Sequence, residues 1–142
     1  MDISIYGSEE KILIADTIYG EARGEIVEFG SDAAIAIANV IMNRYAKSPK
    51  YGETIKEICL RPFQFSCWLP NNPNLAVMKS CERFNTYEYQ ICLSVADEAE
   101  KGGLKDIIRG SNHYHAYGIT PKWALGRTPT ARIGRHIFYY IA

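Results

Sequence analysis

The residue best suited to acid–base chemistry is Glu21, within the segment Ile18-Tyr19-Gly20-Glu21-Ala22-Arg23-Gly24-Glu25. Ile14, Thr17 and Ile18 precede it by seven, four and three positions, so all four side chains share one stripe of a helix. A carboxylate on an inward stripe must be paired, hydrogen-bonded or held protonated, because a bare buried charge is costly. Beside a cleft, such a group can act as a general acid. The alternative is that Glu21 and Glu25 are solvated carboxylates that form ordinary salt bridges with Arg23.

A second group with chemical potential is the run His113-Tyr114-His115. In an extended strand the two histidines share one face and Tyr114 occupies the other. The histidine pair could bind a metal or line a polar cleft, or one face could simply pack while the other is solvated. A zinc site needs further ligands, and nothing in the spacing brings His136 or Glu21 to complete one. We therefore expect no metal and no cofactor.

The stretch Phe63-Gln64-Phe65-Ser66-Cys67-Trp68 alternates polar side chains with aromatic rings. Rings stack on sugar faces and amides bind hydroxyl groups, so the stretch suits carbohydrate recognition, although a loop anchored in a core would look the same. A cysteine hydrolase that uses Cys67 or Cys92 with a histidine is possible in composition only. A phosphate-binding glycine loop and a nucleophile elbow are both missing from the sequence.

Length and composition favour one globular domain spanning residues 1–142. The 16 basic and 16 acidic side chains cancel, which gives no electrostatic case for nucleic-acid binding. The most apolar run, residues 33–42, is too short to cross a membrane, so we expect no membrane insertion. The N-terminus shows no signal peptide, and the four cysteines are expected to be reduced thiols, mostly in the core.

The elements that must position these residues are mainly helical. The pattern predicts an extended lead over residues 1–7, a helix from Glu9 to Ala22 that Ser8 caps, and a loop between Gly24 and Gly30. Further helices are predicted at residues 33–45, 55–60 and 87–101, the first of them apolar nearly all round and central to the core. Residues 62–74 should form an irregular loop, and residues 112–116 and 137–141 short extended runs. The predicted class is mainly α, with a small β or irregular element.

Six segments carry a family resemblance: Ile18–Glu25, Ala36–Arg44, Phe63–Ser66, His113–Ala116, Pro121–Trp123 and Ile133–Tyr139. Together they resemble, in the same order, the cell wall hydrolase family of SleB type, the spore-cortex-lytic enzymes and their relatives in phages and other bacteria. The resemblance covers about residues 12–140. The Gly-Glu-Ala-Arg-Gly-Glu block and the Ile-Gly-x-His-x-Phe ending are its most specific parts.

The resemblance implies a lysozyme-like fold that acts on peptidoglycan at the β-1,4 bond between N-acetylmuramic acid and N-acetylglucosamine. It implies Glu21 as the single catalytic acid of a lytic transglycosylase, which leaves 1,6-anhydro ends. Glu25 and Arg23 are expected in supporting roles, with Glu25 holding Arg23 or the loop because the helix register should break at Gly24. The candidate substrate-binding residues are Gln64, Phe65, Ser66, Tyr114 and His115.

Three alternatives stay open: a hydrolytic muramidase acting on the same bond, a non-catalytic wall-binding or virion module, and a zinc-dependent amidase that uses the histidines. Many relatives carry a signal sequence and a wall-binding domain, whereas this chain shows neither. We therefore expect a bare catalytic domain, made in the cytoplasm, that reaches the bacterial wall through lysis or as a component of a phage particle or tail.

Overall fold

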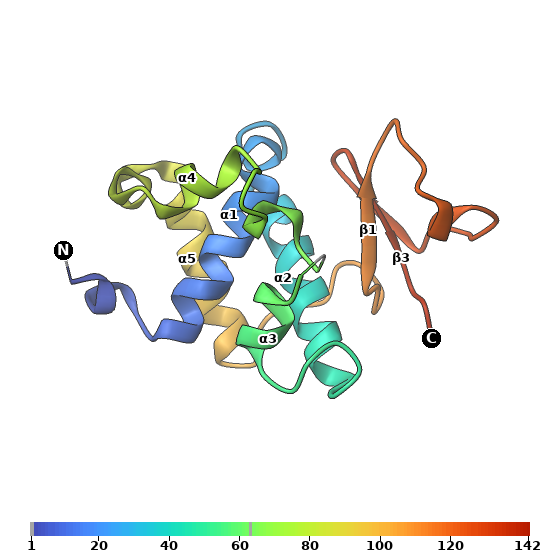
Figure 1. Ribbon diagram of the computed structural model, residues 1–142, viewed down its shortest axis with the longest axis horizontal. Helices are drawn as coiled ribbons and strands as arrows, with labels where there is room; N and C mark the ends of the chain where they lie inside the picture. Colours follow the sequence, from blue (N-terminus) through green and yellow to red (C-terminus); the bar gives the residue numbers. More distant parts are fainter. Residues whose placement is uncertain (1, 63) are drawn as a thin grey trace.

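The computed structural model describes residues 2–62 and 64–142. Phe63, part of the predicted sugar-binding stretch, lies outside the described residues. Helices make up one side of the molecule and a small sheet lies on the other (Figure 1). This agrees with the predicted mainly helical class.

Helix α1 (Glu9–Phe29) is the longest element and carries the acidic segment. Ser8 caps it as predicted, because its hydroxyl accepts a hydrogen bond from the Lys11 amide at 3.0 Å. The predicted end at Ala22 is wrong: the helix continues through Gly24 and stops at Gly30, which has a φ of 78°. Burial of Ile26 one turn beyond Ala22 outweighs the modest cost of a glycine in a helix.

Helix α2 (Ser31–Ala46) lies at the centre of the core, as its apolar sequence predicts. Helix α5 (Tyr87–Glu100) packs against both α1 and α2, and the Thr86 side chain caps it. The short α3 (Ile55–Leu60) begins after Thr54, whose hydroxyl accepts a hydrogen bond from the Glu57 amide. These three helices confirm the predicted ones to within about two residues.

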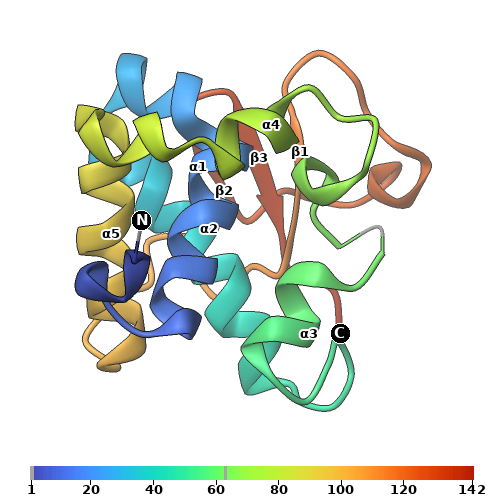
Figure 2. The same cartoon turned by 60° about the vertical axis from the view of Figure 1, so that its left-hand side comes forward.

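The chain from α3 to α4 (Asn74–Lys79), green in Figures 1 and 2, runs beside α1 and contacts it. It includes a 3₁₀ turn, η2 (Ser66–Trp68), within the stretch predicted as irregular. Helix α4 and a second 3₁₀ turn, η3 (Cys81–Asn85), were not predicted. Helix α4 is as short as α3, but it begins after Pro73 and has no capping side chain, whereas Thr54 caps α3. The N-terminal lead is likewise a 3₁₀ turn, η1 (Ile3–Tyr6), and not an extended strand, because the Asp2 carboxylate caps it.

The sheet consists of β1 (His113–Ala116), β2 (Ala131–Ile133) and β3 (His136–Tyr139), all antiparallel, with β3 between the other two. Its register pairs His113 with Tyr139 and Ala116 with His136. The predicted extended runs correspond to β1 and β3, whereas the three-residue β2 has too little pattern to be recognised. A further short 3₁₀ turn, η4 (Lys122–Ala124), follows β1.

Three of the four cysteines, Cys59, Cys67 and Cys92, are buried free thiols, in line with the predicted core role, and Cys81 is exposed. Burial raises the pKa of both Cys67 and Cys92, so their thiols stay protonated and do not suit a cysteine hydrolase. Among the helices described, none combines the length and the hydropathy needed to cross a membrane.

Candidate active site

A cleft of about 560 Å³ lies between α1 and the strand β1. Side chains from α1, α2, the η2 turn and the sheet face it. Its lining consists of Gly20, Glu21, Arg44, Tyr51, Gln64, Ser66, Asn74, His113, Tyr114, His115, Ala116, Trp123 and His136. Among these described residues Glu21 is the one carboxylate, so the cleft holds a single candidate acid.

Glu21 receives two hydrogen bonds, one on each carboxylate oxygen. The Tyr114 hydroxyl donates to Oε1, and the Cys67 backbone N–H donates to Oε2 at 3.0 Å. Ile14, Thr17 and Ile18 are fully buried, which confirms the inward stripe that the helical spacing predicts. The alternative of a solvated surface carboxylate is therefore wrong for Glu21.

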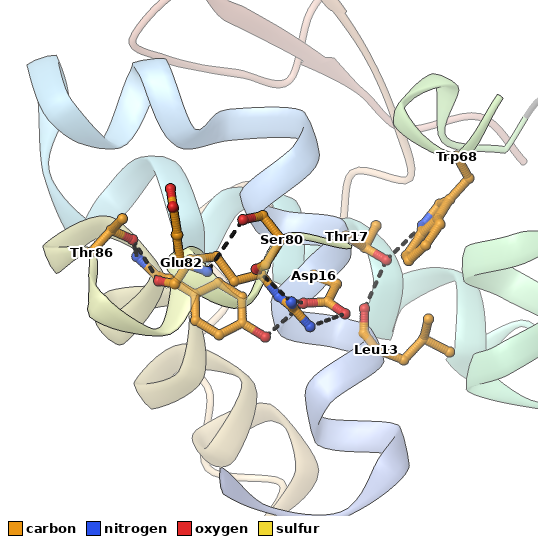
Figure 3. A network of polar contacts seen from close by, with 9 residues as sticks. Leu13, Asp16, Thr17, Trp68, Ser80, Glu82 and Thr86 are labelled. Atoms are coloured by element: carbon orange, nitrogen blue, oxygen red, sulfur yellow. Dashed lines mark hydrogen bonds and ion pairs between the residues drawn. The ribbon is translucent and has the colours of Figure 1, made fainter. Parts of the chain in front are cut away.

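The donor at Cys67 is fixed by close contact between the η2 turn and α1. A Cβ placed on Gly20 would lie 2.8 Å from the Cβ of Cys67 and 2.3 Å from the Met78 sulfur, so only glycine allows this approach. The Trp68 indole N–H also donates to the Thr17 hydroxyl at 3.0 Å. Figure 3 shows Thr17 between Trp68 and Leu13, whose carbonyl accepts the Thr17 hydroxyl hydrogen.

The donor at Tyr114 comes from β1. Burial and the neighbouring Glu21 raise the pKa of Tyr114 well above its ordinary value, so its hydroxyl keeps the proton that it donates. The Tyr114 ring meets the edge of His136, which also lines the cleft, at a centroid distance of 5.1 Å. Burial lowers the pKa of His136, although Glu25 and Glu21 oppose this shift.

The histidines of β1 lie on the face opposite Tyr114 in the strand alternation, as predicted. His113 packs between Tyr51 and Trp123, and His115 stacks on Tyr139, to whose hydroxyl its Nε2 is hydrogen-bonded. Burial lowers the pKa of His113 to about 4, with smaller contributions from nearby cations. At neutral pH the ring is therefore uncharged, and its Nδ1–H donates to the Asn112 side-chain oxygen at 2.8 Å.

Of the predicted substrate-binding residues, Gln64, Ser66, Tyr114 and His115 line the cleft. Phe65 does not, because it is 2% exposed and belongs to the core. The centre of its ring lies 5.0 Å from the Arg44 guanidinium, so Phe65 packs against Arg44, which does line the cleft.

Arg44 is the main cleft residue that the sequence prediction missed. Ile37, Val40 and Ile41 precede it at the same spacing that marks Glu21, and all three are fully buried. An arginine on an inward stripe was therefore a usable signal. Tyr51, Asn74 and Trp123 also line the cleft, but they lie in turns or at an element end, where no periodicity identifies them.

The prediction that Glu25 holds Arg23 or the loop after Gly24 is wrong, because α1 continues through this segment and Glu25 contacts Arg135. Glu25 remains in α1 and accepts a hydrogen bond from the Arg135 backbone N–H at 2.9 Å, with the Arg135 guanidinium 3.8 Å away. It therefore holds the turn between β2 and β3. Arg23 lies over the Tyr19 ring, outside the cleft lining, and its Nη1 is buried without a hydrogen-bond partner among the described residues.

Within the described residues, no three His, Cys, Asp or Glu side chains come together as a metal site. The histidines instead hydrogen-bond to protein groups or pack against aromatic rings.

Comparison with known proteins extends the resemblance. The spore cortex-lytic enzyme of Bacillus subtilis (strain 168) is 29% identical over 133 residues, which cover 89% of this chain and 36% of that protein. The spore cortex-lytic enzyme of Oceanobacillus iheyensis is 27% identical over 140 residues, covering 94% and 42%. The chain thus spans well under half the length of these curated relatives.

Two solved structures share the fold. The catalytic domain of the Bacillus cereus SleB protein aligns with a TM-score of 0.63 at 24% identity, covering 92% of this chain and 90% of that one. The catalytic domain of the germination-specific lytic transglycosylase SleB from Bacillus anthracis aligns with a TM-score of 0.64 at 24% identity, covering 93% and 95%. They confirm the mainly helical fold with its small sheet.

The family model described as Cell Wall Hydrolase matches residues 30–139. This range covers most of the chain, including the sheet and the cleft residues that follow α1, whereas Glu21 lies just before it. The chain therefore belongs to the cell wall hydrolase family.

Proposed function

We propose that this chain degrades peptidoglycan as a lytic transglycosylase, with Glu21 as its catalytic acid and base. The bond cut would be the β-1,4 link between N-acetylmuramic acid and N-acetylglucosamine. The observation that carries the proposal is that Glu21 is the one carboxylate among the described residues that line the cleft.

The number of carboxylates bears on the mechanism. Most glycoside hydrolases place two carboxyl groups about 5 to 10 Å apart, one as acid and the other as nucleophile or base. Glu25, one turn further along α1, is engaged by Arg135 and does not line the cleft. A transglycosylase needs only one carboxyl group, because the substrate supplies its own nucleophile.

In the proposed reaction, the Glu21 carboxyl group gives its proton to the bridging oxygen as the bond from that oxygen to C1 of the muramic sugar breaks. The 6-hydroxyl of the same sugar then attacks C1 and forms the 1,6-anhydro ring. The hydroxyl proton passes to the Glu21 carboxylate, which restores the acid. Tyr114 and the Cys67 amide orient the carboxylate throughout.

The direct test is Glu21→Gln, assayed on purified peptidoglycan by loss of turbidity and by mass spectrometry of the soluble products. The amide keeps the size of the side chain but cannot supply the proton, so activity should fall by a factor of about a thousand or more while the fold is kept. Glu25→Gln is the matched control: its amide oxygen still accepts the Arg135 N–H, and activity should stay within a few-fold of wild type. Undiminished activity in Glu21→Gln would refute the assignment.

The products separate the remaining alternatives. Anhydro ends support the transglycosylase, whereas reducing ends indicate a hydrolytic muramidase acting on the same bond. Binding to the wall without released fragments indicates a non-catalytic module, and loss of activity on chelation indicates a zinc amidase. The relatives cited above are spore cortex-lytic enzymes, so carriage in a phage particle stays a prediction without support from them.

A further inference from the structure

A row of three rings lines part of the cleft. The His113 ring lies between those of Tyr51 and Trp123, at centroid distances of 5.9 and 5.3 Å, and all three residues line the cleft. Burial lowers the pKa of His113 to about 4, so the row itself is uncharged at neutral pH. The electrostatic character of this part of the cleft is therefore set by the side chains at the two ends of the row.

An exposed cation flanks each end of the row. Lys50 Nζ lies 5.6 Å from the centre of the Tyr51 ring, and Arg127 Nε donates to the Trp123 carbonyl at 2.8 Å. Among the described residues, no carboxylate lies within 4.0 Å of either cation. Both cations are also close enough to His113 to oppose its protonation. Lys50 and Arg127 together form the basic rim of the cleft.

The sequence around the basic rim supplies almost no negative charge. Residues 107–142, which contain the whole sheet, hold no aspartate or glutamate but five basic side chains, Arg109, Lys122, Arg127, Arg132 and Arg135. The acidic residue nearest to Lys50 along the chain is Glu53, which forms no ion pair with a described residue. The Glu21 carboxylate on α1 is engaged by Tyr114 and the Cys67 amide. Although the chain as a whole is neutral, a ligand at the basic rim meets positive charge.

We propose that the basic rim binds the stem peptide of peptidoglycan through the α-carboxylate of its second residue, D-glutamate. This inference rests on the proposed function for its choice of substrate. Each stem peptide is joined to a muramic sugar by an amide bond to the lactyl group, so a glycan strand in the cleft carries peptides with it. The D-glutamate is linked onward through its side chain, which leaves the α-carboxylate free. A carboxylate between a lysine and an arginine gains charge-assisted contacts that its amide does not.

The position of the basic rim favours this carboxylate over the one at the free end of the stem. Both cations contact residues that line the cleft, so they lie beside the path of the glycan. A carboxylate two residues from the sugar reaches that place with few rotatable bonds to order, whereas the free end of the stem costs more conformational entropy to hold. The uncharged rings between the cations suit the apolar alanine that precedes the glutamate.

The test measures binding in the Glu21→Gln background, so that the ligands stay intact. Titration calorimetry compares two tetrasaccharides of alternating N-acetylglucosamine and N-acetylmuramic acid with alanyl-glutamate stems. In the first ligand the glutamate α-carboxylate is free and its side-chain carboxyl is an amide, and in the second both are amides. At low salt we expect the first ligand to bind about three- to tenfold tighter, the range for exposed charge pairs, and about 0.5 M salt should remove most of the difference. Equal affinities at low salt would overturn the proposal.

A third ligand and a competitor identify the source of the negative charge. Moving the free carboxylate to the end of a longer stem, with the glutamate as its amide, should lower the preference to less than about twofold. Full preference for that ligand would overturn the assignment to glutamate. Polyglycerol phosphate at an equal concentration of charge should compete weakly, because it lacks the glycan. Competition as strong as that of the first ligand would show that the basic rim binds a phosphate polymer and would overturn the peptide assignment.

Removing the charge of the basic rim tests the residues. Lys50→Gln combined with Arg127→Gln should abolish the preference, while affinity for the ligand with both amides stays within about twofold. The matched control is Lys56→Gln combined with Lys79→Gln, which removes the same charge from exposed lysines outside the cleft lining and should keep the full preference. An equal loss in the two double variants would mean that net charge and not the basic rim is responsible, which would overturn the proposal.

Arg127→Lys separates the charge of this residue from its structural role. The substitution keeps the charge and removes the hydrogen bond from Nε to the Trp123 carbonyl. The preference should stay within about twofold of that of the parent protein. A loss as complete as in Arg127→Gln would mean that the arginine only positions its loop, and would overturn its role in binding.

The outcomes are separable from those of the proposed function. If the wild-type chain releases no fragments from peptidoglycan but the preference for the carboxylate depends on Lys50 and Arg127, the basic rim stands as a peptide site and the reaction fails. If fragments are released and the two ligands bind equally well, the reaction stands and the peptide site fails.

Discussion

The hydroxyl of Tyr114 and the amide of Cys67 hold Glu21 from opposite parts of the molecule. One donor belongs to the sheet and the other to the turn that follows α3. The carboxylate is therefore oriented only when both parts are docked on α1, and the loss of either donor should affect catalysis more than stability.

Tyr114→Phe should lower kcat by about ten- to a hundredfold, because it removes one charge-assisted hydrogen bond from Glu21, the proposed catalytic acid, and keeps the ring. Affinity for an intact glycan, measured in the Glu21→Gln background, should change little. Tyr139→Phe is the matched control, since it removes a strand hydroxyl that bonds His115 and does not touch Glu21. An equal loss in both variants would mean that the sheet, and not the hydrogen bond, is responsible.

His113 should make the protein less stable in mild acid. Its pKa is about 4 in the folded state, against an ordinary value near 6.5, so between these limits only the unfolded chain binds the proton. Stability is fully present above the ordinary value and is lost as the pH falls toward 4. Thermal unfolding from pH 7 to 4 should therefore show a shallower decline for His113→Gln than for wild type. Parallel curves would contradict the prediction.

Helical spacing predicted that Glu21 lies on an inward stripe, and the family resemblance supplied its catalytic role. The same spacing could have drawn attention to Arg44, because a charged side chain on an apolar stripe stands out in the sequence. It could not reveal that Phe65 is buried or that Glu25 binds Arg135. Those depend on how a loop and a turn meet α1, and local periodicity carries no information on contacts between distant segments.

At the scale of elements, α1 contains two glycines with opposite surroundings. Gly20 lies against Cys67 and Met78, whereas a Cβ on Gly24 would meet nothing within 4 Å. The same residue type thus has a packing role at one position and none at the other.

Gly20→Ala should destabilise the protein by about 1 to 3 kcal/mol through overpacking and should also lower activity, because it displaces the turn that carries the Cys67 amide. Gly24→Ala should stabilise it by roughly 0.5 to 1 kcal/mol, since alanine is the better helix former, and should leave activity unchanged. Urea unfolding and the peptidoglycan assay measure both. Similar stability changes at the two positions would show that helix propensity alone, and not the contact with Cys67 and Met78, determines the effect of each substitution.

The long helices were predictable because each has a sustained apolar pattern, and α1 and α5 also begin after a capping side chain, Ser8 and Thr86. The end of α1 was not, since Gly24 looks like a helix terminator until the burial of Ile26 is known. Helix α4 lacks the capping side chain that marks the equally short α3, and strand β2 has only three residues, so tertiary contacts determine both elements.

At the scale of the whole molecule, a buried polar network connects α1 to η3 and to α5. Asp16, labelled in Figure 3, lies in this network. It accepts hydrogen bonds from Arg83 and from the Tyr89 hydroxyl, at 2.9 and 2.6 Å. The Asp16 side chain projects from a different side of α1 than Glu21 does, and Asp16 does not line the cleft.

Asp16→Asn should destabilise the protein by about 3 to 5 kcal/mol, because it leaves the buried Arg83 charge without its partner. The melting temperature should fall by roughly 10 °C or more, while activity well below that temperature remains. Glu57→Gln, which breaks an exposed ion pair with Arg61, is the control and should cost no more than about 1 kcal/mol. Calorimetry that finds the two variants equally stable would contradict this.

The hydrogen bond between Glu25 and the Arg135 backbone couples the position of the sheet to that of α1. Glu25 lies one helical turn beyond Glu21, so the residue that would deliver the proton and the residue that anchors the sheet are about 6 Å apart on one rigid rod. When the helix tilts or bends, both move together, and Tyr114 moves with the sheet. The helix thus couples the position of Glu21 to that of the sheet that supplies the Tyr114 hydroxyl.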